Sequence, residues 1–156
     1  MELSPCGWLL AQAARLTGGP LPYTRNALGA CVVVVTEDAA LGGYVWTRSY
    51  PRAGRFPQVV HSAKRFSGAT GLEEFLGFGL IMRLTVHEVD EALVFRSAGY
   101  AFEVLGHRFG LPAWLAPGRC EVTHRAETDA RFSFTLTLDH PLLGRLARQV
   151  AFFEEV

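Results

Sequence analysis

The sequence predicts an α+β protein that is mainly antiparallel β sheet, with one helix at its N-terminal end. Apolar and polar residues alternate with a period of two over several segments after residue 28, the pattern of strands that bury one face. Turn signals recur often enough to keep every strand short. A single domain over residues 1–156 is expected, because 49% hydrophobic and 19% charged residues suit one packed core.

The predicted helix covers residues 4–17. Ser4 and Pro5 read as an N-cap followed by proline at the first helical position. Three apolar residues share one face of this helix: Leu9, Ala13 and Leu16. Glycine and proline at residues 18–20 end the pattern. Polar residues interrupt the apolar stretch, so we expect neither a signal peptide nor a membrane span, and a cytoplasmic location.

The sheet is predicted to extend over residues 28–155. Its clearest strand is 131–139, where apolar residues at even positions alternate with polar ones. The stretch 80–86 alternates in the same way, with the even positions inward, and forms a predicted hairpin with 93–105. The valine-rich run at 30–35 predicts a strand covered on both faces. Weaker strands are expected at residues 44–50, 59–66, 72–76, 119–128 and 145–153.

The longest gap between predicted strands is residues 106–118, which contain three glycines and two prolines. We expect a loop there with at most one helical turn, at 113–116. Antiparallel strands joined by short turns favour a meandering barrel or a curved half-barrel, of the calycin or lipocalin kind, because closure removes unpaired edges. The helix is expected to pack against one end of this barrel.

Composition and motifs argue against most chemistries. Fifteen basic and fifteen acidic residues give no net charge, so a nucleic-acid partner is not expected. Three scattered cysteines are typical of reduced cytosolic thiols. No nucleophile elbow, phosphate loop or Cys-x-x-Cys occurs, and no histidines have metal-ligand spacing, so neither cofactor nor metal is expected. Enzymatic activity is left uncertain, with Glu73 and His124 as weak catalytic candidates.

Aromatic residues predicted to face inward indicate a hydrophobic ligand cavity, although a filled core explains them equally well. They are Trp46, Phe95 or Phe102, Phe132 and Phe134, together with Met82. The neighbours Glu73 and Glu74 must point to opposite faces of a strand, and one of them is expected to face inward. His140, which precedes a proline, is expected to be a turn residue.

From Trp46 onward the sequence resembles a bacterial family, the domain of unknown function 4166. The resemblance covers roughly residues 21–153, and the order and spacing of its motifs carry it. The matching residues are Trp46, Arg48, Tyr50, Ser62, Leu72-Glu73, Gly77, Leu111-Pro112, Leu115, Pro117, Glu121, Phe132-Ser133-Phe134 and Pro141-Leu142-Leu143-Gly144. Tyr50 departs from the usual phenylalanine. Members often follow a saccharopine-dehydrogenase-like NADP-binding reductase, so the resemblance implies an NADP-dependent reductase as a candidate partner.

The resemblance places Arg48 and Glu73 at motif positions, and we expect the two to pair inside the barrel because a buried charge needs a partner. The predicted function is binding of a hydrophobic or lipid-like small molecule. A reductase encoded elsewhere is a candidate partner that this binding protein would serve. An enzyme that uses Glu73, Arg48 or His124 in acid–base or anion-holding roles is one alternative, and a structural or dimerisation module with a filled core is another. The predicted ligand-binding residues are Trp46, Arg48, Ser62, Glu73, Met82, Trp114, Glu121, Phe132 and Phe134.

The mouth of the ligand site is predicted beside the loop 106–118, because long loops on a rigid barrel are common places for recognition. Trp114 and Leu115 are the predicted lid residues, since an apolar pair on a loop is costly in water unless it packs over something apolar. The simpler alternative is that Trp114 caps the core from outside.

Overall fold

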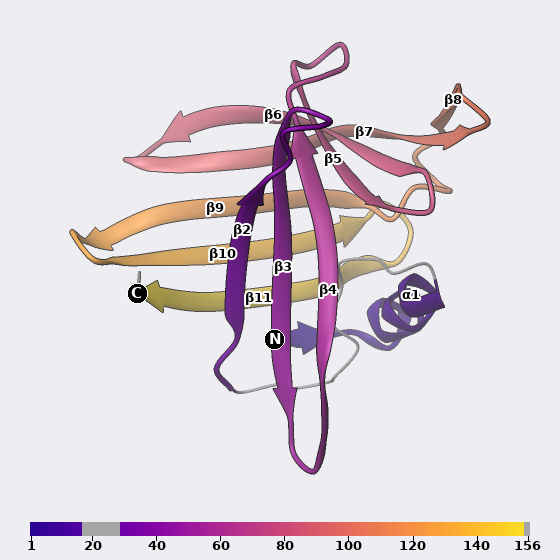
Figure 1. Cartoon of the computed structure of the whole chain (residues 1–156). Helices are drawn as coiled ribbons and strands as arrows, with labels where there is room; N and C mark the ends of the chain where they lie inside the picture. Colours follow the sequence, from indigo (N-terminus) through magenta and orange to yellow (C-terminus); the bar gives the residue numbers. More distant parts are fainter. Residues whose placement is uncertain (17–28, 155–156) are drawn as a thin grey trace.

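A computed structural model describes residues 1–16 and 29–154 (Figure 1). One helix, α1 (Pro5–Leu16), and eleven strands are present in these residues. The strands are β1 (Glu2–Leu3), β2 (Val32–Glu37), β3 (Gly43–Arg52), β4 (Arg55–Arg65), β5 (Leu72–Gly77), β6 (Leu80–Val89), β7 (Ala92–Val104), β8 (His107–Leu111), β9 (Arg119–Thr128), β10 (Arg131–His140) and β11 (Gly144–Glu154). The predicted helix end at residue 17, the stop signal at 18–20, the sheet start at residue 28 and its end at residue 155 lie outside the described residues.

All eleven strands belong to one antiparallel sheet, in the order β1-β11-β10-β9-β7-β6-β5-β4-β3-β2. The long strand β7 is shared, because its first residues pair with β9 and its last residues pair with β8. The sheet is curved but not closed, and strands β2 to β4 pass in front of β9 to β11 (Figure 1). The predicted fold class is therefore confirmed in its half-barrel form. We call the side on which the two ends of the sheet face each other the concave face.

The helix α1 begins where its capping signals predict. The backbone N–H of Gly7 donates to Ser4 Oγ at 3.0 Å, and the N–H of Trp8 donates to the Ser4 carbonyl at 2.8 Å. The buried face is not the predicted one, since Leu9 is 62% exposed while Ala11 is fully buried. Small residues set this contact with β11, because a Cβ on Gly7 would lie 1.9 Å from the carbonyl oxygen of Leu146.

Strand β2 lies at an end of the sheet and pairs only with β3. The prediction that the run 30–35 is covered on both faces is wrong, since Val32, Val34 and Val35 are 46–60% exposed. Apolar content suggested a central strand, but strand order depends on distant pairings that a short apolar run does not report.

The predicted hairpin of β6 and β7 is confirmed, but its predicted alternation is only partly right. Met82 and Leu84 are buried as expected. Ile81, assigned to the wet face, is fully buried, and Val86, assigned to the core, is 45% exposed. The reason is that both faces of the sheet are covered near Ile81, whereas the last residues of β6, 86–89, are all exposed.

The stretch 106–118 is not simply a loop, because it contains β8. This strand pairs with the end of β7. Its residues are almost all exposed, so the sequence shows no apolar alternation from which the strand could be predicted. The predicted turn at 113–116 is present, since the N–H groups of Leu115 and Ala116 both donate to the Pro112 carbonyl at 3.0 Å.

Two hydrophobic clusters stabilise the described sheet. The larger comprises Leu76, Met82, Leu84, Tyr100 and Ala116. The smaller comprises Leu138, Leu146 and Ala147, near the helix. The core is therefore concentrated around β5 to β7 and around the start of β11.

Candidate functional site

A group of polar and aromatic side chains lies on the concave face of β3, β4 and β5. The register pairs Trp46 with Ser62 and Lys64 with Glu74 across neighbouring strands, and such partners project from the same face. Arg48 follows Trp46 by two residues and so shares that face. We call Trp46, Arg48, Ser62, Lys64 and Glu74 the concave cluster.

Glu74 is the centre of the concave cluster and is only 7% exposed. Lys64 Nζ lies 3.2 Å from Glu74 Oε2, and Arg48 Nη2 lies 3.8 Å from Glu74 Oε1. Arg48 Nη1 donates a hydrogen bond to Ser62 Oγ at 3.2 Å. Burial alone raises the pKa of the Glu74 carboxyl, but Lys64, Arg48 and a hydrogen bond with Ser62 outweigh burial and hold that pKa below its usual value. Glu74 is therefore an anion at neutral pH.

Both cations of the cluster lie near the indole ring of Trp46. Lys64 Nζ lies 4.6 Å from the ring centroid and Arg48 Cζ lies 5.8 Å from it, within the range of cation–π attraction. The buried Nε1–H of Trp46 has no hydrogen-bond acceptor among the described residues. The cluster thus contains an ordered donor whose hydrogen-bonding capacity is not used by residues 29–154.

An aromatic group from β9, β10 and β11 lies next to the concave cluster. Trp46 meets Phe134 edge to face at 6.4 Å across the concave face. Around Phe134, His124 stacks at 4.5 Å, and two phenylalanines contact it edge to face. The members of this aromatic group are His124, Phe132, Phe134 and Phe153, and all are half-buried. Burial lowers the pKa of His124, so its imidazole is neutral at neutral pH.

The remaining titratable groups near the cluster stay protonated at neutral pH. Burial raises the pKa of the Cys31 thiol and of the Tyr50 hydroxyl, which Gln149 of β11 hydrogen-bonds. Burial also raises the pKa of Cys120 to about 12 and that of Tyr100 further still. A thiol reacts as the thiolate, so neither cysteine is prepared to act as a nucleophile.

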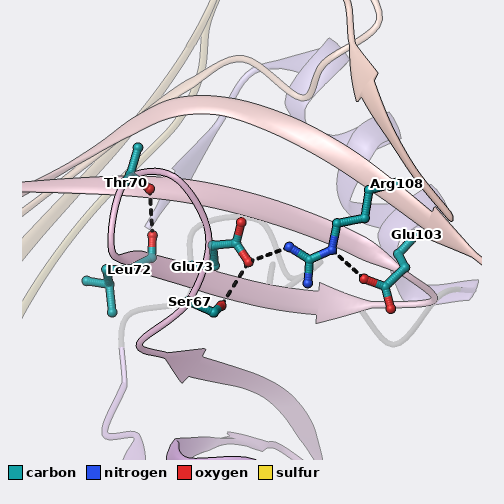
Figure 2. A network of polar contacts seen from close by, with 6 residues as sticks. All are labelled: Ser67, Thr70, Leu72, Glu73, Glu103 and Arg108. Carbon is teal, nitrogen blue, oxygen red and sulfur yellow. Dashed lines mark hydrogen bonds and ion pairs between the residues drawn. The ribbon is translucent and has the colours of Figure 1, made fainter. Parts of the chain in front are cut away.

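The prediction that Arg48 pairs with Glu73 is wrong. Glu73 lies on the opposite face of β5 from Glu74 and is 2% exposed. Its Oε2 accepts hydrogen bonds from Ser67 Oγ and Arg108 Nη1, both at 2.9 Å, and Arg108 Nε also donates to Glu103 at 2.6 Å (Figure 2). Because side chains alternate along a strand, only one of Glu73 and Glu74 can point to the concave face. That residue is Glu74.

The structure distributes the other predicted site residues over several places. Trp46, Arg48 and Ser62 meet in the concave cluster, and Phe132 and Phe134 in the aromatic group. Met82 is the cross-strand partner of Glu74 and is buried in the larger hydrophobic cluster. Glu121 instead forms an ion pair with Arg96 at 2.7 Å.

The predicted lid residues do not cover the core. Trp114 is 66% exposed and Leu115 is 57% exposed, so the expectation that they pack over apolar side chains is wrong. Ala116 is the residue of this turn that enters the larger hydrophobic cluster. His140 is a turn residue as expected, since its Nδ1 accepts the N–H of Leu142 at 3.2 Å.

Sequence reasoning missed Lys64 and the role of Glu74. Lys64 is the only lysine in the chain, and arginine fills every other basic position. This difference is the one sequence feature that could have drawn attention to Lys64. The cross-strand pairing of Lys64 with Glu74 depends on register, which the sequence did not reveal.

A hollow of about 580 Å³ lies at the ends of β9, β10 and β11, and Phe153 of the aromatic group is one of its lining residues. Two charged residues on its rim, Arg131 and Glu154, pair with each other. No group of three or more His, Cys, Asp and Glu side chains is placed to hold a metal ion in residues 1–16 and 29–154. No helix of the described chain is long and apolar enough to cross a membrane.

The fold and the site define an open, curved antiparallel half-barrel with a charged and aromatic inner face. The chain belongs to the family designated domain of unknown function DUF4166, whose model matches residues 2–153. No curated protein and no solved structure matched the chain.

Proposed function

We propose that the concave face binds a small, largely apolar molecule. The observation that supports this most directly is the half-buried state of the aromatic group, whose rings are ordered against each other yet keep part of their surface accessible. Apolar surface that remains accessible on a concave face gives a ligand area to bury. A core filled by its own side chains would bury these rings as fully as Met82 and Leu84 are buried on β6, in the middle of the sheet.

The enzymatic alternative finds less support in the geometry. Glu73 is held by Ser67 and Arg108 on the opposite face, away from the concave cluster. Glu74 is ionised, and the neighbouring thiols are protonated. Service to an NADP-dependent reductase stays a prediction, because it comes from the family resemblance alone.

Binding can be tested with a neutral fluorescent probe, Nile red, together with native mass spectrometry of protein purified from its own host. Wild-type protein should bind the probe, and Phe134→Ala should weaken binding about tenfold, ~1.4 kcal/mol, because it removes the ring that contacts Trp46 and His124. The matched control is Phe56→Ala, since Phe56 is 92% exposed. A co-purifying small molecule would support the proposal. Equal losses of probe affinity in the two variants, or no binding by wild type, would contradict the proposal and favour a structural module with a filled core.

A further inference from the structure

The concave cluster carries one more positive charge than it can neutralise. Arg48 and Lys64 are two cations, and the carboxylate between them is Glu74 alone. Tyr50, Cys31 and Cys120 near the cluster and His124 of the aromatic group are neutral, since the pKa of the first three is raised and that of His124 is lowered. The register also puts Glu37 on this face, but that residue is exposed at the end of β2. Within the described residues, the cluster therefore has a charge of plus one in a largely buried setting.

The surplus charge belongs to Arg48 rather than to Lys64. Lys64 contacts Glu74 directly at 3.2 Å, whereas Arg48 lies 3.8 Å from it, beyond hydrogen-bond distance. The guanidinium has five N–H donors, and its contact with Ser62 uses only part of this capacity. Arg96 and Arg108 differ, because each donates through Nε to a carboxylate within 2.7 Å.

The surroundings of Arg48 keep its guanidinium in place without neutralising it. Its side chain is 20% exposed, so a molecule on the concave face can reach it. Ser62 holds one nitrogen and the Trp46 ring lies beside the carbon of the guanidinium. The Trp46 Nε1–H has no acceptor among the residues described, and a buried donor without an acceptor is destabilising.

We propose that Arg48 binds a carboxylate carried by the apolar molecule, with the apolar part against the aromatic group. This inference rests on the proposed function, because it names the polar end of the same ligand. A carboxylate has one negative charge, which equals the surplus of the cluster, and its two oxygens match the fork of a guanidinium. A doubly charged phosphate monoester would leave a buried negative charge, so it fits less well.

A series of ligands with one chain length tests the carboxylate directly. Decanoate, decanol, decylamine and decyl phosphate share their apolar part, and isothermal titration below their critical micelle concentrations gives the affinity of each. Wild-type protein should bind decanoate at least about tenfold more tightly than decanol, a difference of ~1.4 kcal/mol. Decylamine should bind more weakly than decanol, because like charges repel.

The variants separate Arg48 from general electrostatics. Arg48→Met should bind decanoate and decanol equally, while Arg48→Lys should keep part of the preference and serves if Arg48→Met folds poorly. Arg55→Met is the matched control, because Arg55 is exposed at the start of β4. It should keep the full preference.

Three results would overturn the inference while leaving the proposed function in place. They are equal affinity of wild type for decanoate and decanol, a preference for decanoate that survives Arg48→Met, and tighter binding of decyl phosphate than of decanoate. Binding of no member of the series by wild type would instead reject the proposed function, and the carboxylate with it.

Discussion

The adjacent carboxylates Glu73 and Glu74 lie on opposite faces of β5 and have different partners there. On the convex face, Glu73 and Glu103 share Arg108, whose Nη1 and Nε donate one hydrogen bond to each, and Ser67 also donates to Glu73 (Figure 2). On the concave face, Glu74 is outnumbered by two cations. A network whose cation is hydrogen-bonded to its carboxylates stabilises a fold, whereas Arg48, 3.8 Å from Glu74 and without a hydrogen bond to it, has donors left for a ligand.

Close packing supports the same contrast. A Cβ on Gly68 would lie 2.1 Å from Glu73 Oε1, so the turn after β4 lies directly on this carboxylate. The Trp46 ring, which lies beside the two cations that pair with Glu74, is only half-buried. Stability should therefore depend more on Glu73, and binding more on the neighbours of Glu74.

The largest expected effect on stability is that of Glu73→Ala. It leaves the Ser67 hydroxyl without its acceptor and removes a buried partner of Arg108. We expect a loss of ~2–3 kcal/mol in the free energy of unfolding, below the usual ~3–5 for a buried pair because Arg108 is 41% exposed. Urea denaturation measures it. Glu103→Ala, at a half-exposed position, should cost less than ~1 kcal/mol, and similar losses for both would contradict the assigned roles.

A smaller effect, with a distinct pH dependence, is expected for Glu74→Gln. The folded pKa of Glu74 is lower than its usual 4.5, so its charge contributes stability above that value and the contribution is lost as pH falls through the folded pKa. At pH 7 the variant should be less stable by ~1–2 kcal/mol, the order of the cost of a lost buried partner, because Lys64 and Arg48 lose the anion between them. As the pH is lowered below 4.5, the free energies of unfolding of wild type and Glu74→Gln should converge. A gap that stays constant on acidification would show that the charge of Glu74 is not what stabilises the fold.

The smallest effect on stability is expected for Trp46→Phe. Loss of the larger ring costs packing, but loss of an N–H without an acceptor among the described residues offsets it, so the change should stay within ~1 kcal/mol. Affinity for decanoate should nevertheless fall severalfold, because Trp46 lies beside Arg48. Thermal melting and titration together measure both. Destabilisation well beyond this range, with unchanged affinity, would place Trp46 among the purely structural residues.

The period-two pattern predicted most of the strands, because alternation is local information. It could not decide between Glu73 and Glu74, since two adjacent carboxylates fit either phase of a strand and only register selects one. It missed β8, whose residues are exposed and show no alternation. The position of β2 at an end of the sheet depends on strand order, a non-local property.

The pairing of β1 with β11 has a consequence for synthesis of the chain. Glu2 and Leu3 lie beside Arg148 and Ala147, and the Ser4 N–H donates to the Leu146 carbonyl at 3.0 Å. During translation at about 5–20 residues per second, residues 1–16 are made about 6–26 seconds before β11 begins. Strands β2 to β7 pair with chain neighbours and can fold as they emerge. The segment that is translated early is thus among the last to reach its native place.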